Sequence, residues 1–335
     1  MKKFTIIAGI DVSKLKLDVS IVTDLSEKKP HHFVVENNRE GILKMFKDLE
    51  NKDLTLKDTL FCFEHTGIYT HHLCTILHEY QYNYSMIPAI EIKRSRGLVR
   101  GKSDKADSRE IARYALTHEH KLKLSTLPEA DITKLKLLLV EKDKFKKSIS
   151  IISSSNENEG FLPTEMLENM VEVNNKTVDF LKNSVKEIDK LIDALIKKNE
   201  AIQKNFNLAC SVPGVGKTIA VQLIMYTKNF TCFENSRKLA CFAGMAPFAY
   251  SSGTSVIGRT KVSNIANKKL KSLLTMGSLA TIRYDKQMKQ YYDRKVKEGK
   301  NKMLVINTIR CKIIDRVFAV IKRGTPFVDT FKFAA

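Results

Sequence analysis

The chain has 335 residues, of which 43% are hydrophobic, and this is enough for two or three domains with cores of their own. Its formal net charge is +20, and a chain this basic usually meets a polyanion, with nucleic acid ahead of an anionic membrane. The sequence has no run of about 18 apolar residues, which excludes a membrane-spanning helix, and its six cysteines form no CxxC pair, which argues against a zinc site.

The first 90 residues predict a mixed α/β sheet covered by helices. Residues 1–12 favour a buried first strand over a signal peptide, so we expect a cytoplasmic protein. Residues 4–23 contain two β-rich runs around a polar turn, and residues 32–36 predict a third strand. The remaining elements are a helix from near Asn38, a strand at 59–64, a helix at about 68–81 and a strand at 83–89. Three strands before the first helix exclude the strict βαβ alternation of a dinucleotide fold.

Residues 126–205 predict a helical segment that is interrupted by a polar turn at 153–165. After this turn, apolar residues recur at alternating spacings of three and four, which is a coiled-coil pattern of nearly three heptads. These residues are Val178, Leu181, Val185, Ile188, Ile192 and Leu195. The pattern leaves two alternatives open, an intramolecular helical hairpin and a dimerisation arm.

A third, globular segment covers residues 206–335, which gives domains at 1–125, 126–205 and 206–335. Between Asn235 and Tyr284, fifty residues contain eight Lys or Arg and no carboxylate. Protein surfaces normally mix charges of both signs. A long segment without acids therefore indicates a face that lies against phosphate.

Four carboxylates stand where a metal site would need them. Asp11 and Glu64 each close an apolar strand, and they would lie side by side if those strands pair. Asp104 and Asp107 are three residues apart at a helix start, so they face the same way. Each acid alone is better explained as structural, and Asp104 also suits the helix dipole. Together they offer the oxygen ligands that two Mg²⁺ ions need to activate a nucleophile at a phosphodiester.

A run of five basic residues directly precedes the last two acids, and it would draw a nucleic-acid backbone to the metal site. The run consists of Lys93, Arg94, Arg96, Arg100 and Lys102. The adjacent histidine pairs at 31–32 and 71–72 lack the spacing of helical metal ligands, and we interpret them as surface residues.

Residues 213–220, PGVGKTIA, resemble a nucleotide-binding loop but fit it poorly. A P-loop needs a glycine where Ser211 stands, and no apolar strand ending in Asp follows. The segment fits better the hairpin of helix-hairpin-helix DNA-binding units, in which glycines let the backbone approach a phosphate and Lys217 adds charge. A tight turn between helices without any ligand is an equal alternative.

Three motifs of the N-terminal part resemble the insertion-sequence family 110 transposases. The stretches GIDVSK at 9–14, FCFEHTG at 61–67 and KSDKADSREIA at 102–112 are similar to the DEDD motifs of that family. Its members are RNA-guided DNA recombinases with a RuvC-like domain of the RNase H fold. The resemblance implies that Asp11, Glu64, Asp104 and Asp107 form the metal-binding quartet.

The segment 239–274 is similar to the C-terminal transposase domain of the same family. Its blocks are Gly244–Pro247, Ser252-Gly253, Gly258 and 262–267, and the last block departs from the pattern at Asn264 and Ala266. The family uses a serine beside the glycine as its nucleophile, which implies Ser252, with Ser251 as the adjacent alternative. A hydroxyl in such a turn can attack a phosphate and split strand exchange into two steps.

The resemblance implies a fold of class α/β plus α and a transposase that excises and inserts a mobile element. Its implied partners are double-stranded DNA at the element ends and target, a structured bridge RNA, and further copies of the chain in a dimer or tetramer near the nucleoid. Mg²⁺ is the implied cofactor, with Mn²⁺ as a substitute. The alternatives are a stand-alone RuvC-like junction nuclease without serine chemistry and a non-catalytic binding module. The expected nucleic-acid contacts are Arg94, Arg96, Arg100, Lys102, Lys217, Arg259, Lys261, Lys268 and Lys269.

Overall fold

The computed structural model describes residues 4–26, 30–65, 67–95, 103–154, 164–252 and 256–329. The chain divides into two compact units, Met1–Leu127 and Pro128–Ala335. Each unit has hydrophobic cores built from its own residues. The division into three domains that the sequence suggests stays a prediction.

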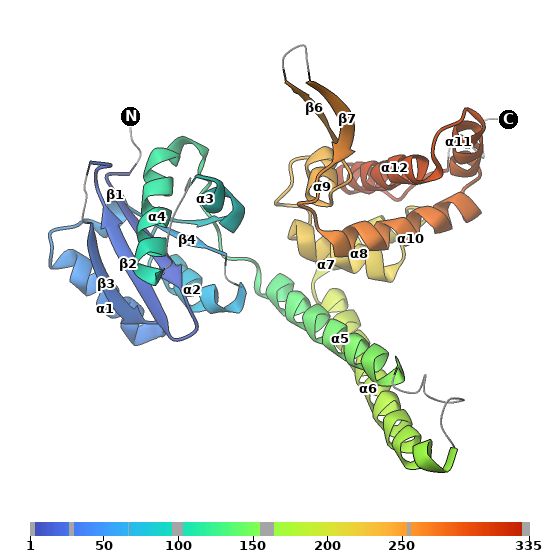
Figure 1. Ribbon diagram of the computed structural model, residues 1–335, viewed down its shortest axis with the longest axis horizontal. Helices are drawn as coiled ribbons and strands as arrows, with labels where there is room; N and C mark the ends of the chain where they lie inside the picture. Colours follow the sequence, from blue (N-terminus) through green and yellow to red (C-terminus); the bar gives the residue numbers. More distant parts are fainter. Residues whose placement is uncertain are drawn as a thin grey trace. The chain divides into compact units, whose positions relative to one another are not determined.

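The first unit is built on a five-stranded mixed sheet, as the sequence predicted (Figure 1). The strand order is β3-β2-β1-β4-β5. β1, β2 and β3 pair antiparallel, whereas β4 pairs parallel to both β1 and β5. The strands are β1 (Ile6–Val12), β2 (Lys16–Val22), β3 (His31–Glu36), β4 (Thr59–Glu64) and β5 (Tyr84–Ile87).

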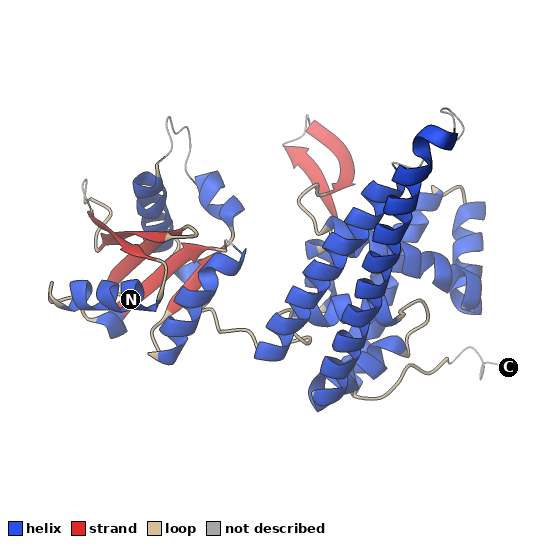
Figure 2. Ribbon diagram, turned by 90° about the horizontal axis from the view of Figure 1, so that it is seen from below, coloured by secondary structure: helices blue, strands red, loops and turns tan. Residues whose placement is uncertain are grey.

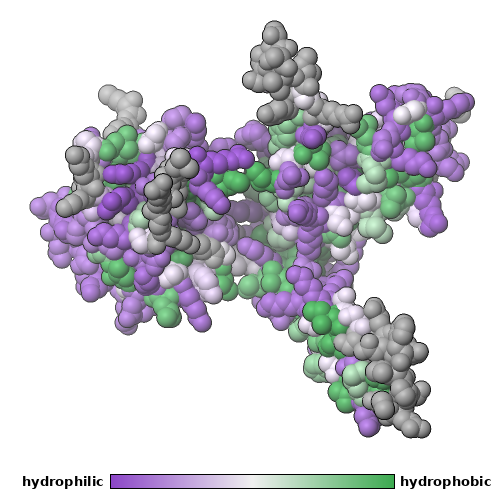
Figure 3. Space-filling model, in the orientation of Figure 1, coloured by the Kyte–Doolittle hydropathy of each residue, from purple (hydrophilic) through white to green (hydrophobic). Residues whose placement is uncertain are grey.

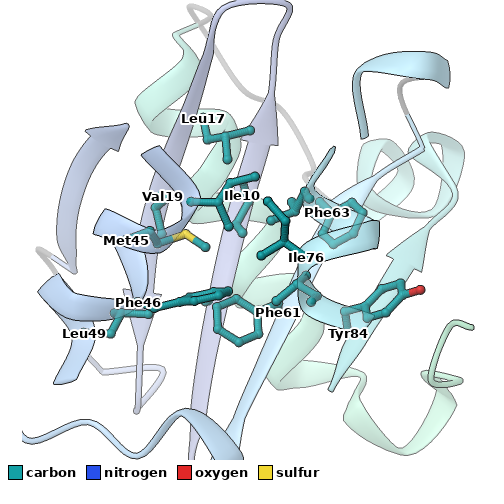
Figure 4. Close-up of a cluster of buried hydrophobic side chains, with 14 of the residues drawn as sticks. Ile10, Leu17, Val19, Met45, Phe46, Leu49, Phe61, Phe63, Ile76 and Tyr84 are labelled. Carbon is teal, nitrogen blue, oxygen red and sulfur yellow. The ribbon is translucent and has the colours of Figure 1, made fainter. Parts of the chain in front are cut away.

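Helices cover both faces of this sheet. They are α1 (Arg39–Glu50), α2 (His71–Glu79), α3 (Ala89–Ser95) and α4 (Asp104–Thr117), with short 3₁₀ turns at Leu56–Asp58, Gly67–Thr70 and Glu119–Lys121. The cluster beneath α1 and α2 contains Ile10, Met45, Phe46 and Phe61, which lie together in Figure 4. A second cluster, with Ile7, Cys62 and Ile111, lies beneath α3 and α4. Because successive residues of a strand point to opposite faces, β1 supplies side chains to both clusters.

In its described residues, the second unit is helical apart from one β-hairpin, and Figures 1 and 2 show its long helices. α5 (Ala130–Ser154) and α6 (Thr164–Lys198) pack against each other as a helical hairpin. A bundle follows, and its helices enclose one core. Its elements are α7 (Glu200–Cys210), α8 (Lys217–Thr227), α9 (Ser236–Phe242), β6 (Pro247–Ser252), β7 (Val256–Val262), α10 (Lys268–Tyr284), α11 (Lys286–Lys297) and α12 (Lys302–Arg323).

The C-terminal half of the heptad stripe predicted in α6 packs within the chain. Ile188, Ile192 and Leu195 are buried in a cluster with Leu135 and Leu139 of α5, as the hairpin alternative expects for these three residues. The alternative of a dimerisation arm stays a prediction. The hairpin nevertheless keeps apolar side chains at its surface, which Figure 3 shows in green. These exposed residues are Leu137, Val140, Ile151, Val173, Phe180 and Leu191.

No helix in the described part of the chain is long and apolar enough to cross a membrane.

Candidate active site

Two of the predicted acids lie at the same end of neighbouring strands. β1 and β4 pair in parallel, with Ile10 opposite Phe63, and Asp11 and Glu64 are the next residues of the two strands. Parallel strands end at the same edge of a sheet. The pairing of these two strands, which the sequence analysis required for Asp11 and Glu64 to lie together, is therefore present. Both side chains are half-buried there. Their catalytic role stays a prediction.

A close approach of α4 to β1 brings the other two acids to this edge. A Cβ atom at Gly9 would overlap with the backbone of α4 at Ser108, so only glycine lets the helix lie this near to the strand. Gly9 and Asp11 share the face of β1 that α4 covers, since they are two residues apart. Asp104 and Asp107 lie in the first turn of α4, just before Ser108. Asp107 is buried, with 9% of its surface exposed.

Two polar contacts fix the start and the register of α4. The Ser103 side chain accepts a hydrogen bond of 3.2 Å from the Ala106 N–H, which caps the helix. The hydroxyls of Ser20 on β2 and Ser108 on α4 are 2.8 Å apart, and both side chains are fully buried. A buried hydrogen bond is specific in its geometry, because an unpaired hydroxyl there would be costly. The serine pair therefore holds α4 in register over the sheet.

The electrostatics around Asp11 support this convergence. Its pKa is raised from the ordinary 3.8 to about 6, first because burial disfavours the carboxylate and then because other carboxylates repel it. The repelling acids, in order of effect, are Asp107, Asp104, Asp18 and Glu64. All three of the other predicted acids thus act on Asp11. Perturbed titration of this kind is typical of functional sites, although structural networks also produce it.

The sequence interpretation missed a fifth carboxylate and its partners. Asp18 lies opposite Asp11 in the antiparallel pairing of β1 and β2, and it is 4% exposed. Lys16 Nζ donates to Asp18 Oδ2 at 2.9 Å and to Asp104 Oδ2 at 2.8 Å. His32 Nε2 lies 3.0 Å from Asp18 Oδ1, so the interpretation of His32 as a surface residue was wrong. An acid inside the apolar run at 16–22 was the available sequence signal.

The donor set suits a hard divalent cation in chemistry and charge. Carboxylate oxygens are the ligands that Mg²⁺ prefers, and the repulsion on Asp11 is the kind that a cation relieves. In the described part of the chain, however, no three His, Cys, Asp or Glu side chains stand close enough together to hold an ion as arranged. At Asp104 the charge is met by the Lys16 ammonium instead.

The predicted nucleophile lies on the β-hairpin of the second unit. Ser252 is the last residue of β6 and pairs with Val256 of β7, and Ser251 beside it is exposed. The side chain of Ser252 and residue Gly253 lie outside the described part of the chain. The choice between Ser252 and Ser251 therefore stays a prediction.

The motif blocks around this hairpin pack against each other at its base. Gly244 has φ +68°, and a Cβ there would overlap with Ala266. Asn267 accepts a hydrogen bond from the Leu270 N–H at 2.9 Å and caps α10. Lys271 Nζ donates to the Gly244 carbonyl at 2.9 Å. These contacts give the glycine and asparagine positions a structural role in holding the hairpin on α10.

The glycine turn at 213–216 connects two helices. α7 precedes it where a P-loop requires a strand, which contradicts the nucleotide-binding alternative. Gly214 has φ +85° and packs on α10, where a Cβ would overlap with Thr281. Gly216 instead faces open space at the N-terminus of α8. The first glycine thus serves packing, and only the second is free for a ligand.

The predicted basic contacts differ in their surroundings. Lys217 Nζ donates to Asp193 Oδ2 at 2.6 Å, and Lys269 pairs with Asp143 of α5, so a carboxylate engages each of them. Among the other predicted contacts, the exposed side chains are Arg94, Lys261 and Lys268. The remaining predicted contacts, Arg96, Arg100, Lys102 and the side chain of Arg259, lie outside the described part of the chain.

Comparison with known proteins connects this chain to DNA recombination. It is 24% identical over 328 residues to the pilin gene-inverting protein of Moraxella lacunata, covering 95% of this chain and 96% of that protein. It is 32% identical over 115 residues to an uncharacterized 43.6 kDa protein of insertion element IS110 from Streptomyces coelicolor, which covers 34% of this chain and 28% of that protein.

A solved structure, T. thermophilus RuvC in complex with Holliday junction substrate, matches 36% of this chain and 99% of its own at 11% identity, with a TM-score of 0.28. A TM-score this low does not establish a common fold. Two family models match much more of the sequence. The model of the Transposase IS116/IS110/IS902 family matches residues 207–293, and the model of the DEDD transposases of IS110, described as Transposase, matches residues 8–157. Because these matches together cover more than half of the chain, it belongs to the IS110 family of DNA transposases and recombinases.

Proposed function

We propose that this enzyme excises and inserts a DNA element by strand cleavage and exchange that depends on both a divalent cation and a serine. The observation that carries the proposal is the placement of Asp11 and Glu64 at the same end of paired parallel strands, with Asp104 and Asp107 in the first turn of the helix that packs on β1. A protein has little structural reason to gather so much negative charge, because each acid raises the free energy of the others. A cation offsets that cost, and phosphodiester chemistry uses it.

In this proposal, the four predicted acids hold the metal and orient the reacting phosphate. When bound, Mg²⁺ or Mn²⁺ supplies a Lewis acid that neutralises charge on the phosphate oxygens. Asp11 and Glu64 come from rigid strands, whereas Asp104 and Asp107 come from the first turn of a helix. Such a frame keeps the carboxylates in place through the reaction, so little free energy is spent on ordering them.

Ser252 is the proposed nucleophile. Its Oγ would form a bond to phosphorus while the bond from phosphorus to the leaving sugar oxygen breaks, and the leaving oxygen takes up a proton. The resulting phosphoserine link conserves the phosphodiester for rejoining to a second strand. Ser252 is the last residue of β6 and lies within residues 207–293, which the transposase family model matches, and this supports the choice.

The proposed substrates are the DNA ends of an element and its target, recognised with a structured bridge RNA. The formal charge of +20 and the carboxylate-free stretch between Asn235 and Tyr284 support nucleic-acid binding. The resemblance to the family is the support for the RNA. Inversion of a gene, which the name of the Moraxella relative describes, requires the same cutting and rejoining at two sites.

We further propose that the enzyme works as a dimer or tetramer. Strand exchange at two sites needs two sets of reacting groups. The helical hairpin offers an apolar surface for contact, since Phe180 and Val173 are 70% and 62% exposed. Exposed apolar patches on a soluble protein commonly mark interaction sites.

A strand-exchange assay tests the chemistry. Full-length protein is mixed with element ends, target DNA and the RNA transcribed from the flank of the gene, with Mg²⁺ or EDTA. We expect a covalent protein–DNA adduct that forms only with Mg²⁺, disappears in Ser252→Ala and persists in the matched control Ser251→Ala. Strand exchange that survives in Ser252→Ala would remove the serine mechanism, and full activity in EDTA would remove the metal.

The same assay separates the alternative of a stand-alone junction nuclease. Such an enzyme would cut branched DNA in Ser252→Ala at the rate of the wild type and would form no adduct. The match of the Transposase IS116/IS110/IS902 family model to residues 207–293 favours the transposase, since a junction nuclease has no use for this segment.

A further inference from the structure

The Lys16 side chain contacts both Asp104, one of the four predicted acids, and the buried Asp18. Its ammonium donates to Asp104 at 2.8 Å and to Asp18 at 2.9 Å, so one cation bridges two carboxylates from different elements. We propose that Lys16 is the resident cation of the metal-free site: Asp18 holds it on Asp104, and it gives up Asp104 when a divalent cation binds. This inference rests on the proposed metal site.

The two carboxylates that share Lys16 are not equivalent. The Asp18 side chain is 6% exposed, stands within a paired strand and has His32 on its other oxygen. The Asp104 side chain is 47% exposed and begins a helix. A bond inside a rigid, buried setting keeps its geometry, whereas an exposed ion pair is weak and easily exchanged. A competing cation will therefore take Asp104 from Lys16, and Lys16 will stay on Asp18.

The exchange has two consequences. Without metal, Lys16 offsets part of the repulsion among the acids, so it should stabilise the empty site. With metal, the bound ion must break the contact between Lys16 and Asp104 and then face a positive charge nearby, so Lys16 should weaken metal affinity. A lysine that formed only a surface ion pair would do neither to a measurable extent.

Metal binding by the full-length protein, without DNA, tests the proposal. Free Mn²⁺ is followed by electron paramagnetic resonance during titration. We expect Lys16→Met to bind Mn²⁺ roughly tenfold more tightly than the wild type and to melt at a lower temperature in EDTA, with the loss recovered on adding Mn²⁺. Lys14→Met is the matched control, because Lys14 is exposed and stands two residues before Lys16, between β1 and β2. It removes the same charge from the chain and should leave both values unchanged.

The double variant Lys16→Met/Asp18→Asn distinguishes direct exchange from a general effect of charge. It removes one positive and one negative group, so the net charge of the site stays that of the wild type. Tight Mn²⁺ binding in the double variant supports the exchange, whereas a return to wild-type affinity overturns it. Equal affinity of Lys16→Met and wild type also overturns it.

Asp11→Asn separates a failure of this inference from a failure of the proposed function. If Mn²⁺ binds the wild type and Asp11→Asn abolishes binding, the metal site stands, and any absence of a Lys16 effect refutes the exchange alone. If none of the proteins binds Mn²⁺, the proposed metal site fails, and the exchange fails with it.

Discussion

The charge on Asp11 should destabilise the metal-free protein, and Asp11→Asn should remove that cost. The folded protein raises the pKa of Asp11 from 3.8 to about 6, chiefly by burial and then by the neighbouring acids. A raised pKa means that the folded state holds the proton more tightly than the unfolded state does. The stability of the wild type therefore falls as the pH rises from about 4 to 6 and stays low above that range. Asparagine keeps the shape of the side chain without the charge.

The size of the effect follows from the shift. A change of one pKa unit corresponds to about 1.4 kcal/mol, so the rise at Asp11 would correspond to about 3 kcal/mol for a fully shielded group. Asp11 is half-buried, and solvent screens part of the repulsion. We expect Asp11→Asn to raise the free energy of unfolding of the first unit by about 1–2 kcal/mol at pH 7.5, and by almost nothing below pH 4.

Hydrogen exchange followed by mass spectrometry measures this change in stability within the first compact unit. The chain has two compact units, and peptides from β1 and β4 report on the first one alone. Protection of these peptides is compared in EDTA and in Mg²⁺ across the pH range, with Ser251→Ala as a control in the other unit. Mg²⁺ should stabilise the wild type more than the variant. A variant less stable than the wild type at pH 7.5, or a difference independent of pH, would refute the reasoning.

Three further predictions concern Gly9, the glycine pair of the turn at 213–216, and Lys217. Gly9→Ala should destabilise the first unit by about 2 kcal/mol in urea denaturation, because the methyl group forces α4 off the sheet; an unchanged midpoint would contradict this. Gly214→Ala should cost about 2 kcal/mol or more, whereas Gly216→Ala should cost about 1 kcal/mol or less, and equal losses would contradict the different roles of the two glycines. Lys217→Ala should change stability by less than about 1 kcal/mol and retain strand exchange, since its pair with Asp193 is exposed; loss of all activity would contradict this.

The sheet and the edge where the acids meet could be predicted from local patterns. Alternating or continuous apolar runs define strands, and their order before the first helix excludes an all-parallel sheet. Once β1 and β4 pair in parallel, Asp11 and Glu64 come to the same edge of the sheet, because Asp11 is one residue from the end of β1 and Glu64 ends β4. The sequence also predicted that Asp104 and Asp107 share one face of a helix start, which the first turn of α4 provides.

Contacts that depend on the distance between elements could not be predicted. The role of Gly9 becomes visible only when the α4 backbone lies on β1, because a glycine within a strand can equally mark a bulge or a sharp bend. The link between Lys16 and Asp104 spans 88 residues and needs the register of the sheet and of the helix together. His32 looked like a surface residue because its partner, Asp18, was not recognised as part of the site.

The glycines at 9, 214 and 216 show why residue type alone does not reveal function. Gly9 in β1 and Gly214 in the turn after α7 both allow a close approach of backbone, and in each case the partner is a helix of the same chain. In the sequence, the turn at 213–216 supported a phosphate contact and a plain turn between helices equally well. The two glycines of this turn differ in the space around the missing side chain, which is filled at Gly214 and open at Gly216.

The acid cluster also explains why the first unit needs a substantial core on each face of its sheet. In the proposed metal site, the carboxylates repel one another while no cation is bound, so the fold must supply the opposing free energy. Burial of apolar side chains such as Phe61 and Phe63 on one face, and of Ile111 on the other, provides it close to the charges. The Ser20–Ser108 pair then keeps α4 from relaxing away from β1. Acids on a less rigid frame would spread apart and lose the arrangement that the proposed metal site requires.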